Sequence, residues 1–142
     1  MPDGSEDPAD TDESPGSGTH GEEAIERLAG YLERVRGGEA PARVEAELLA
    51  LLGSSHALAV LQEFALEDGP RRFSELEESL SISPSTLSQR LGEFVDAGLL
   101  ERRSYDEIPP RVEYRATEAT AALEPLFLYL SSWLDQHDVE TP

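Results

Sequence analysis

The chain has 142 residues, of which 38% are apolar, 30 are acidic and 11 are basic, giving a formal net charge of −19. This length supports one domain with a tail and is too short for two full cores. Cysteine is absent, which excludes disulfides and thiolate metal sites. No apolar run is long enough to span a bilayer and the N-terminus is acidic, so we expect a cytoplasmic protein without a membrane partner.

The charge is unevenly distributed. Residues 71–115 hold 7 arginines and 9 acids, whereas the rest of the chain holds 4 arginines and 21 acids, and lysine is absent. This bias resembles proteins of salt-in halophilic archaea, whose excess carboxylates keep the surface hydrated. In molar salt the Debye length falls to about 3 Å, so repulsion between an acidic protein and another polyanion is largely screened. The gain from counterion release also weakens, and direct hydrogen bonds must supply more of the affinity.

Two segments precede the main domain. Residues 1–21 are rich in Asp, Glu, Pro, Gly and Ser, and we expect a disordered acidic tail that aids solubility rather than binding a partner. Residues 22–38 form a helical extension that ends at Gly37-Gly38. It either packs on its own domain or extends a dimer interface. Its apolar positions at helical spacing are Ile25, Leu28, Leu32 and Val35.

The main domain, residues 41–138, begins with two expected helices. The first runs from Pro41 to Leu52 with proline in its first turn, and the second starts at Ser54 or Ser55 and runs to Glu67. The apolar face of the first helix comprises Val44, Leu48, Leu51 and Leu52, and the predicted buried face of the second comprises Leu58, Leu61, Phe64 and Ala65.

A helix-turn-helix pattern follows. Ser74 and Glu77 have the spacing of a capping box, which predicts a helix from residues 73–74 to about residue 80. Ser81-Ile82-Ser83 suits a turn. Ser83 is then expected as the N-cap of a second helix, with Pro84 at its first position and Gly98 at its C-terminal end.

This second helix, residues 84–97, has two different faces. Leu87, Leu91, Phe94 and Val95 cluster on the face predicted to be buried. The N-terminal half of the other face and its flanks offer hydroxyl, amide and guanidinium groups, which can bond base edges or phosphates. We therefore predict groove contacts by Ser85, Thr86, Ser88, Gln89 and Arg90.

A hairpin rich in arginine comes next. Its expected strands are residues 99–104 and 111–116, joined by a tip at 105–110. Arg102, Arg103, Arg111 and Arg115 are predicted to hold the DNA backbone. The alternative is that they pair with neighbouring acids on a solvated hairpin, and Arg111 in particular could brace the tip against Glu107.

The last expected helix runs from residue 118 to about 136, with Thr117 as its cap and Pro125 as a kink or break. Its apolar stripe is wider than one small domain needs, which favours a dimer interface over core packing alone. The residues predicted at this interface are Leu126, Phe127, Leu130, Trp133 and Leu134.

The chain resembles HxlR-type transcriptional regulators over residues 42–137. The resemblance rests on the segments Arg72–Leu76, Ser83–Leu91, Ala97–Leu100 and Tyr105–Tyr114, and the Pro-Pro-Arg-Val-Glu-Tyr sequence at 109–114 is the most specific of these. It implies a mainly α, dimeric winged helix-turn-helix with a small β-hairpin wing. It also implies base readout by residues 83–90 and a dimer formed by terminal helices. Many members carry a sensing cysteine, which this chain lacks, and Ser55–Leu58 replaces their usual Lys-Trp.

No catalytic constellation is present, so we expect neither an enzyme nor a bound cofactor. The three histidines, His20, His56 and His137, are not spaced as metal ligands. The leading hypothesis is a homodimeric, sequence-specific regulator that binds double-stranded DNA. The alternative is a winged-helix module that docks another protein with the same surface. The operator, the sign of regulation and any small-molecule effector are not encoded in these patterns.

Overall fold

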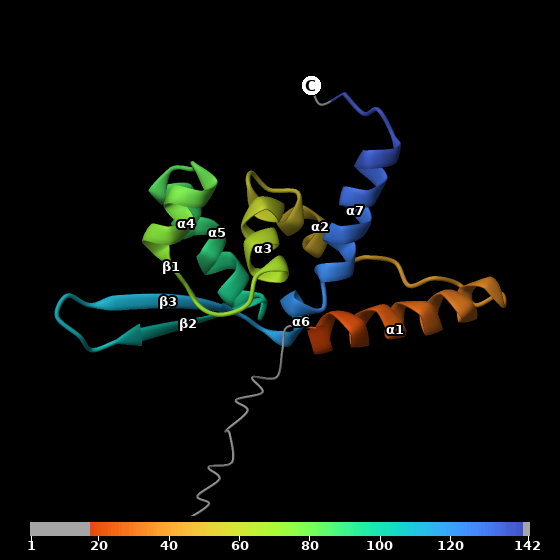
Figure 1. The fold of residues 1–142 in the computed structure, drawn as a ribbon, viewed down its shortest axis with the longest axis horizontal. Helices are drawn as coiled ribbons and strands as arrows, with labels where there is room; N and C mark the ends of the chain where they lie inside the picture. Colours follow the sequence, from red (N-terminus) through yellow and green to blue (C-terminus); the bar gives the residue numbers. More distant parts are fainter. Residues whose placement is uncertain (1–17, 141–142) are drawn as a thin grey trace, which may run out of the picture.

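The computed structural model describes residues 18–140 and is mainly helical (Figure 1). The chain forms helices before, within and after a small antiparallel sheet. The helices are α1 (Gly18–Arg36), α2 (Ala46–Leu52), α3 (Ala57–Leu66), α4 (Phe73–Leu80), α5 (Pro84–Asp96), α6 (Glu118–Ala121) and α7 (Glu124–Gln136), and the strands are β1 (Arg71–Arg72), β2 (Leu100–Tyr105) and β3 (Arg111–Ala116).

The wing is a three-stranded sheet in the order β1-β3-β2, and not only the two-stranded hairpin expected from the sequence. Arg71 lies opposite Tyr114 and Arg72 opposite Glu113, so β1 pairs with β3 just before α4 begins. Two residues are too few to show a strand pattern in a sequence. The return strand has the predicted bounds, and the outgoing strand is shifted by one residue to Leu100–Tyr105.

Helices α3, α4 and α5 lie together at the centre of the molecule, and α2, α6 and α7 pack beside α3 (Figure 1). The hairpin β2–β3 extends to one side of these helices and α1 to the opposite side. Helix α1 contacts α6 and α7, whereas α3 contacts α4, α5, α6 and α7 and is the central element.

The core lies around α3. Its buried residues Ala57, Val60, Leu61 and Phe64 follow the i, i+3, i+4, i+7 spacing of one helical face. The expected core residue Leu58 is instead 38% exposed. Helices α4, α5 and α7 and strand β2 complete the core with Leu76, Leu87, Leu91, Phe94, Leu100 and Phe127.

Two helices begin later than the sequence suggested. Helix α2 starts at Ala46 instead of Pro41, because Glu45 has an extended backbone (ψ 145°) and the Ala42 N–H donates to the Tyr31 hydroxyl (2.7 Å). Helix α3 starts at Ala57, because His56 has left-handed φ (62°). Ser54 does not cap α3; its hydroxyl donates to the Leu51 carbonyl (2.6 Å).

Helix α4 starts where predicted, but the residues predicted to form its capping box, Ser74 and Glu77, are not the ones that do so. Glu75, not Glu77, closes the helix start, since its carboxylate accepts from the Arg72 N–H (3.4 Å). The turn to α5 is as expected: Ser81 has left-handed φ (51°) and Ile82 packs against the core.

The terminal helix breaks into two. Helix α6 ends at Ala121 and α7 begins at Glu124, with Pro125 in its first turn, where no backbone N–H is needed. The side chain of Thr117 does not cap α6 but donates to the Gly98 carbonyl (2.8 Å), and buried Thr120 donates to the Leu99 carbonyl (2.7 Å). The terminal segment is thus tied to the turn that ends α5.

Helix α1 begins four residues before the expected extension, and residues 1–17 of the predicted acidic tail lie outside the described residues. Within residues 18–140, no single helix is long and apolar enough to cross a membrane. Helices α2 and α3 have the necessary length and apolarity only when they are counted together, and the two are bent by 86° relative to each other.

Candidate DNA-binding interface

Helix α5 presents most of its predicted contact residues to solvent. Ser85, Ser88 and Gln89 are exposed, whereas Thr86 is half-buried. The Gln89 amide donates to the Glu93 carboxylate (3.2 Å) on the helix surface. A single exposed hydrogen bond contributes little net stability, so this amide can exchange Glu93 for another acceptor.

The N-terminus of α5 is ordered by Ser83. Its hydroxyl accepts from the Thr86 N–H (3.3 Å), which confirms the predicted N-cap, and it donates to the Thr86 hydroxyl (2.9 Å). Pro84 occupies the first turn. This cap satisfies one of the free N–H groups of the helix and fixes the direction in which α5 leaves the turn.

The Arg90 side chain is mostly buried and engaged in contacts within the protein. Its side chain is only 11% exposed; its Nε donates to the Ser55 carbonyl (2.8 Å), and its Nη1 donates to both carboxylate oxygens of Glu93 (3.0 and 2.9 Å). Arg90 therefore links α5 to the start of α3 and neutralises an acid on the face of α5. In this arrangement its guanidinium does not offer the fork of donors that reads guanine.

The wing arginines lie on two faces of the sheet. Residues directly opposite each other in an antiparallel pair share a face. Arg102 lies opposite Tyr114 and, two residues from buried Leu100, points to the side that packs on α5. Arg103 opposite Glu113 and Arg115 opposite Glu101 lie on the other side.

Arg111 braces the wing, as the alternative interpretation held. Its guanidinium lies 3.2 Å from Glu107, 3.5 Å from Glu113 and 4.1 Å from the Tyr105 ring centroid. By contrast, the other three wing arginines are exposed and make no ion pair within 4.0 Å in the described part of the chain; these are Arg102, Arg103 and Arg115.

Arg72 is a candidate contact that the sequence reading missed. It is exposed at the N-terminal end of α4 and, with Phe73 and Ser74, lines a groove of about 500 Å³ whose other wall is the wing tip. Its guanidinium favours a phosphate group at the mouth of the groove, whereas the groove itself is also lined by Glu77 and Glu107, and Glu75 already caps α4. The sequence feature that could have identified this contact is an arginine directly before a predicted helix start.

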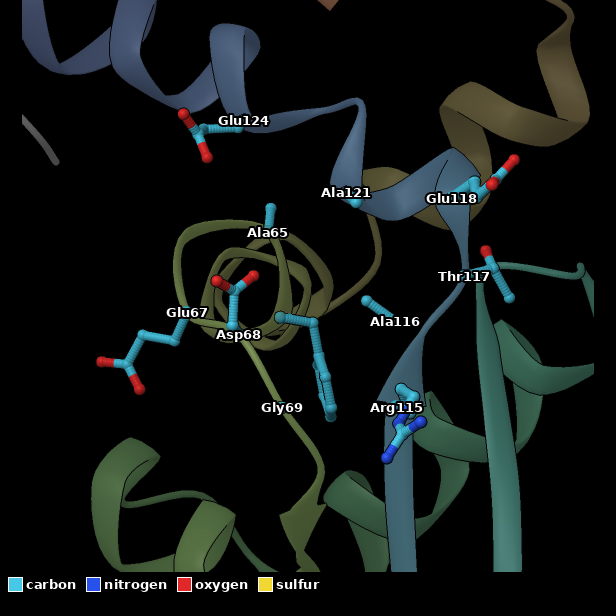
Figure 2. Close-up of a pocket in the computed structure, with 11 residues that line it drawn as sticks. Ala65, Glu67, Asp68, Gly69, Arg115, Ala116, Thr117, Glu118, Ala121 and Glu124 are labelled. Atoms are coloured by element: carbon cyan, nitrogen blue, oxygen red, sulfur yellow. The ribbon is translucent and has the colours of Figure 1, made fainter. Parts of the chain in front are cut away.

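A second cavity, of about 310 Å³, lies between the end of α3, strand β3 and the terminal helices. Figure 2 shows Asp68, Glu124 and Arg115 around it. Glu67 and Glu118 also line it, so acids outnumber the single guanidinium and an anionic ligand would be repelled. Within residues 18–140, no three acidic or histidine side chains lie close enough together to hold a metal.

The expected dimer face of α7 is largely exposed. Leu126 (39%), Leu130 (39%), Trp133 (37%) and Leu134 (54%) remain accessible. Phe127 differs from them, since it is only 6% exposed and belongs to the core of its own chain. Phe127 can therefore add little surface to an interface with a second copy.

Residues 51–141 match the model of the HxlR-like helix-turn-helix family. An uncharacterized HTH-type transcriptional regulator of Halalkalibacterium halodurans is 36% identical over 86 residues, which cover 60% of this chain and 75% of the relative. A second such regulator, from Mycobacterium tuberculosis, is 39% identical over 89 residues, and the match spans only 55% of that longer protein.

Solved structures agree with the fold. The reduced form of the transcriptional regulator YodB from B. subtilis superposes with a TM-score of 0.55 at 32% identity, covering 63% of this chain and 87% of YodB. The redox regulator HypR in its oxidized form superposes with a TM-score of 0.56 at 28% identity, covering 66% of this chain and 95% of HypR.

Proposed function

Because the chain belongs to the HxlR-like helix-turn-helix family, and is thus a DNA-binding transcriptional regulator, we propose that it acts as a homodimer with α5 in the major groove. The observation that carries this proposal is the exposed polar face of α5 next to exposed wing arginines that form no ion pair within residues 18–140. In a two-fold dimer the two recognition helices would enter grooves about 34 Å apart on one side of the duplex.

Base readout is assigned to the exposed side chains of α5. Gln89 can bond both N6 and N7 of adenine once it leaves Glu93, and Ser85 and Ser88 can bond a base edge or a phosphate. The Thr86 hydroxyl accepts a hydrogen bond from Ser83, so Thr86 stabilises the start of α5 and contributes little to base readout. Arg90 acts indirectly, because it holds Glu93 and the start of α3.

Phosphate contacts are assigned to the free guanidinium groups. Arg102 points to the α5 side of the sheet, and Arg103 and Arg115 cover the other side of the wing. Arg72 adds a contact at the N-terminus of α4. Such contacts set register and affinity but carry no sequence information.

The dimer is proposed to use the exposed face of α7. Leu126, Leu130, Trp133 and Leu134 form an apolar stripe, and a partly exposed Trp is a frequent centre of binding energy. Tyr129, exposed by 67%, lies beside this stripe and widens the surface, whereas Leu128 lies on the opposite side of α7.

We further propose that the protein works in a cytoplasm of high salt. The net charge of −19, with arginine as the only basic residue, favours that environment, where the acidic surface no longer repels DNA. The chain contains no cysteine, so its regulation does not depend on thiol oxidation. Any effector would have to be sensed in another way.

The direct test is fluorescence-anisotropy titration of the full chain, in molar KCl, with its own upstream promoter and with a scrambled duplex. We expect Gln89→Ala to weaken promoter binding by about 100-fold and to leave scrambled-duplex binding unchanged, since each of the two copies loses one base contact of about 1–3 kcal/mol. Arg102→Ala should weaken binding to both duplexes, because it removes a phosphate contact.

The matched control is Gln62→Ala, which shortens an exposed glutamine on α3. It should leave both affinities unchanged. A wild-type protein that binds promoter and scrambled DNA equally at every salt concentration would contradict base readout and favour docking of a protein on the same surface.

A further inference from the structure

Helix α1 carries an apolar stripe that its own chain leaves uncovered. Ile25, Leu28 and Leu32 are 50%, 46% and 40% exposed, although they lie at helical spacing on one side. The helix lies against α6 and α7 through its N-terminal part. Gly21, which begins the same stripe, is buried next to Glu124, and Ala24 and Arg27 line a small cavity with Glu118 and Ala122. The stripe therefore loses its cover from Ile25 onward. It also precedes residue 51, where the family match begins.

Helix α2 is equally short of partners. It has seven residues and buries none of them completely, and Leu48 and Leu49 are 41% and 56% exposed. So short a helix is unstable in water without tertiary packing of an apolar face. Val44, just before α2, is also 56% exposed. This part of the chain needs a cover that the protomer does not supply.

These uncovered positions continue into the proposed dimer face. Helix α1 contacts α7, whose Leu126, Leu130 and Leu134 are exposed as well. Exposed apolar side chains scattered singly are normal on soluble proteins, but several on each of three helices, two of which contact each other, favour an interface. A two-fold dimer uses the same patch on both copies, so such a surface can cover itself.

The end of α1 and the end of α7 carry opposite charges. Outside residues 71–115, every basic residue of the chain lies between Arg27 and Arg43. Arg36 and Arg43 form no ion pair within 4.0 Å among the described residues. The end of α7 and the residues after it, 135–140, carry three acids, one histidine and no arginine; the acids are Asp135, Asp138 and Glu140.

We propose that α1 is a dimerisation arm whose stripe of Ile25, Leu28 and Leu32 packs on α2 and α7 of a second copy of this chain. This arrangement brings the basic end of α1 to the acidic end of the partner's α7. It extends the proposed homodimer beyond the family core and rests on that part of the proposed function. A membrane surface fits α1 poorly, because acids outnumber arginines on the helix.

The test is the dimer dissociation constant of the full chain in molar KCl without DNA, from analytical ultracentrifugation. The triple variant Ile25→Gln, Leu28→Gln, Leu32→Gln should weaken the dimer by roughly 100-fold, because three apolar side chains lose their burial at both copies of the contact. The matched control, Glu26→Gln with Glu33→Gln on another side of α1, should leave the constant unchanged. Far-UV circular dichroism verifies that each variant keeps its helices.

A cross-linking experiment tests the position of the arm. The absence of native cysteines lets two tagged versions of the chain, Leu32→Cys and Leu49→Cys, be mixed and oxidised. A mixed disulfide is expected, and it should disappear when α1 also carries Ile25→Gln and Leu28→Gln.

The outcomes separate the arm from the function. A stripe variant that dimerises as tightly as wild type, or a dimer without the mixed disulfide, would overturn the arm. Operator binding is measured separately and depends on α5 and the wing. Loss of sequence-dependent binding by the wild type would overturn base readout while leaving the dimerisation result intact.

Discussion

At the scale of single residues, the arginines of the DNA-binding region divide into two groups. Arg71, Arg90 and Arg111 are committed to carboxylates, and the Arg71 Nη1 lies 2.9 Å from Glu63 and 3.0 Å from Glu67. These three arginines form the first group, and their ion pairs join α3, α5 and the wing to neighbouring segments. The second group is exposed and free of ion pairs with other described residues; it comprises Arg72, Arg102, Arg103 and Arg115.

Arg90→Ala should act on stability rather than on base readout. Removing this 11% exposed guanidinium leaves the Ser55 carbonyl without that donor and Glu93 without its counter-charge. We expect a loss of about 1–3 kcal/mol in the free energy of unfolding, measured by urea titration in molar KCl. Gln89→Ala, at the exposed neighbouring position, should change that free energy by less than about 0.5 kcal/mol. Equal stabilities of wild type and Arg90→Ala would contradict this role.

At the scale of elements, the two ends of α5 are defined by local backbone chemistry. Ser83 caps its start, and Gly98 ends it with left-handed φ (77°). The Gly98 N–H donates to the Val95 carbonyl and the Leu99 N–H to the Phe94 carbonyl, which is a Schellman arrangement. Thr117 and Thr120 then bind carbonyls of the same turn, so the terminal helices share their anchor with the recognition helix.

Two glycine-to-alanine variants should have opposite effects. Gly98→Ala should lower the free energy of unfolding by about 1 kcal/mol, because a side chain disfavours left-handed φ. Gly92→Ala, inside α5 with nothing within 4 Å of the added methyl group, should raise it by about 0.5–1 kcal/mol. Urea unfolding of both variants gives the comparison, and two changes of the same sign would argue against this account of the turn.

At the scale of the whole molecule, each copy carries four exposed arginines that form no ion pair with other described residues, and these predict a steep salt dependence of DNA binding by a dimer. Each neutralised phosphate contributes about −0.9 to the slope of log K against log salt, so the two copies together would give a slope of up to about −7. Hydrogen bonds from α5 must then supply the remaining affinity. The acidic surface elsewhere should suppress non-specific binding to nucleic acid.

Arg102→Ala should reduce the magnitude of this slope by about 2 for a dimer, one phosphate contact being lost in each copy. Arg111→Ala is the control, since its guanidinium is already paired with Glu107 and Glu113 and should change the slope less. Anisotropy titrations between 0.5 and 3 M KCl, a range of about sixfold, cover this dependence. Equal slopes for Arg102→Ala and wild type would remove Arg102 from the backbone contacts.

The amino-acid sequence by itself determined the helix-turn-helix and the return strand. The ends of α5 depend on Ser83, Pro84 and Gly98, which act through local hydrogen bonds and backbone φ angles. Their effect can therefore be predicted from the neighbouring residues in the sequence. Helical periodicity likewise identified the buried side of α5, because burial of that side needs no knowledge of its partner. The exposed face that carries Ser85, Ser88 and Gln89 follows from the same periodicity.

Only the tertiary structure decided what depends on residues far apart in the chain. Strand β1 exists because Arg71 and Arg72 meet β3 some forty positions later, and Arg90 is occupied because it reaches Ser55, 35 residues earlier. Phe127 belongs to the core because α7 packs on α3. A local pattern reports which side chains can bond or be buried, whereas the partner that each one takes is set by the way distant segments pack.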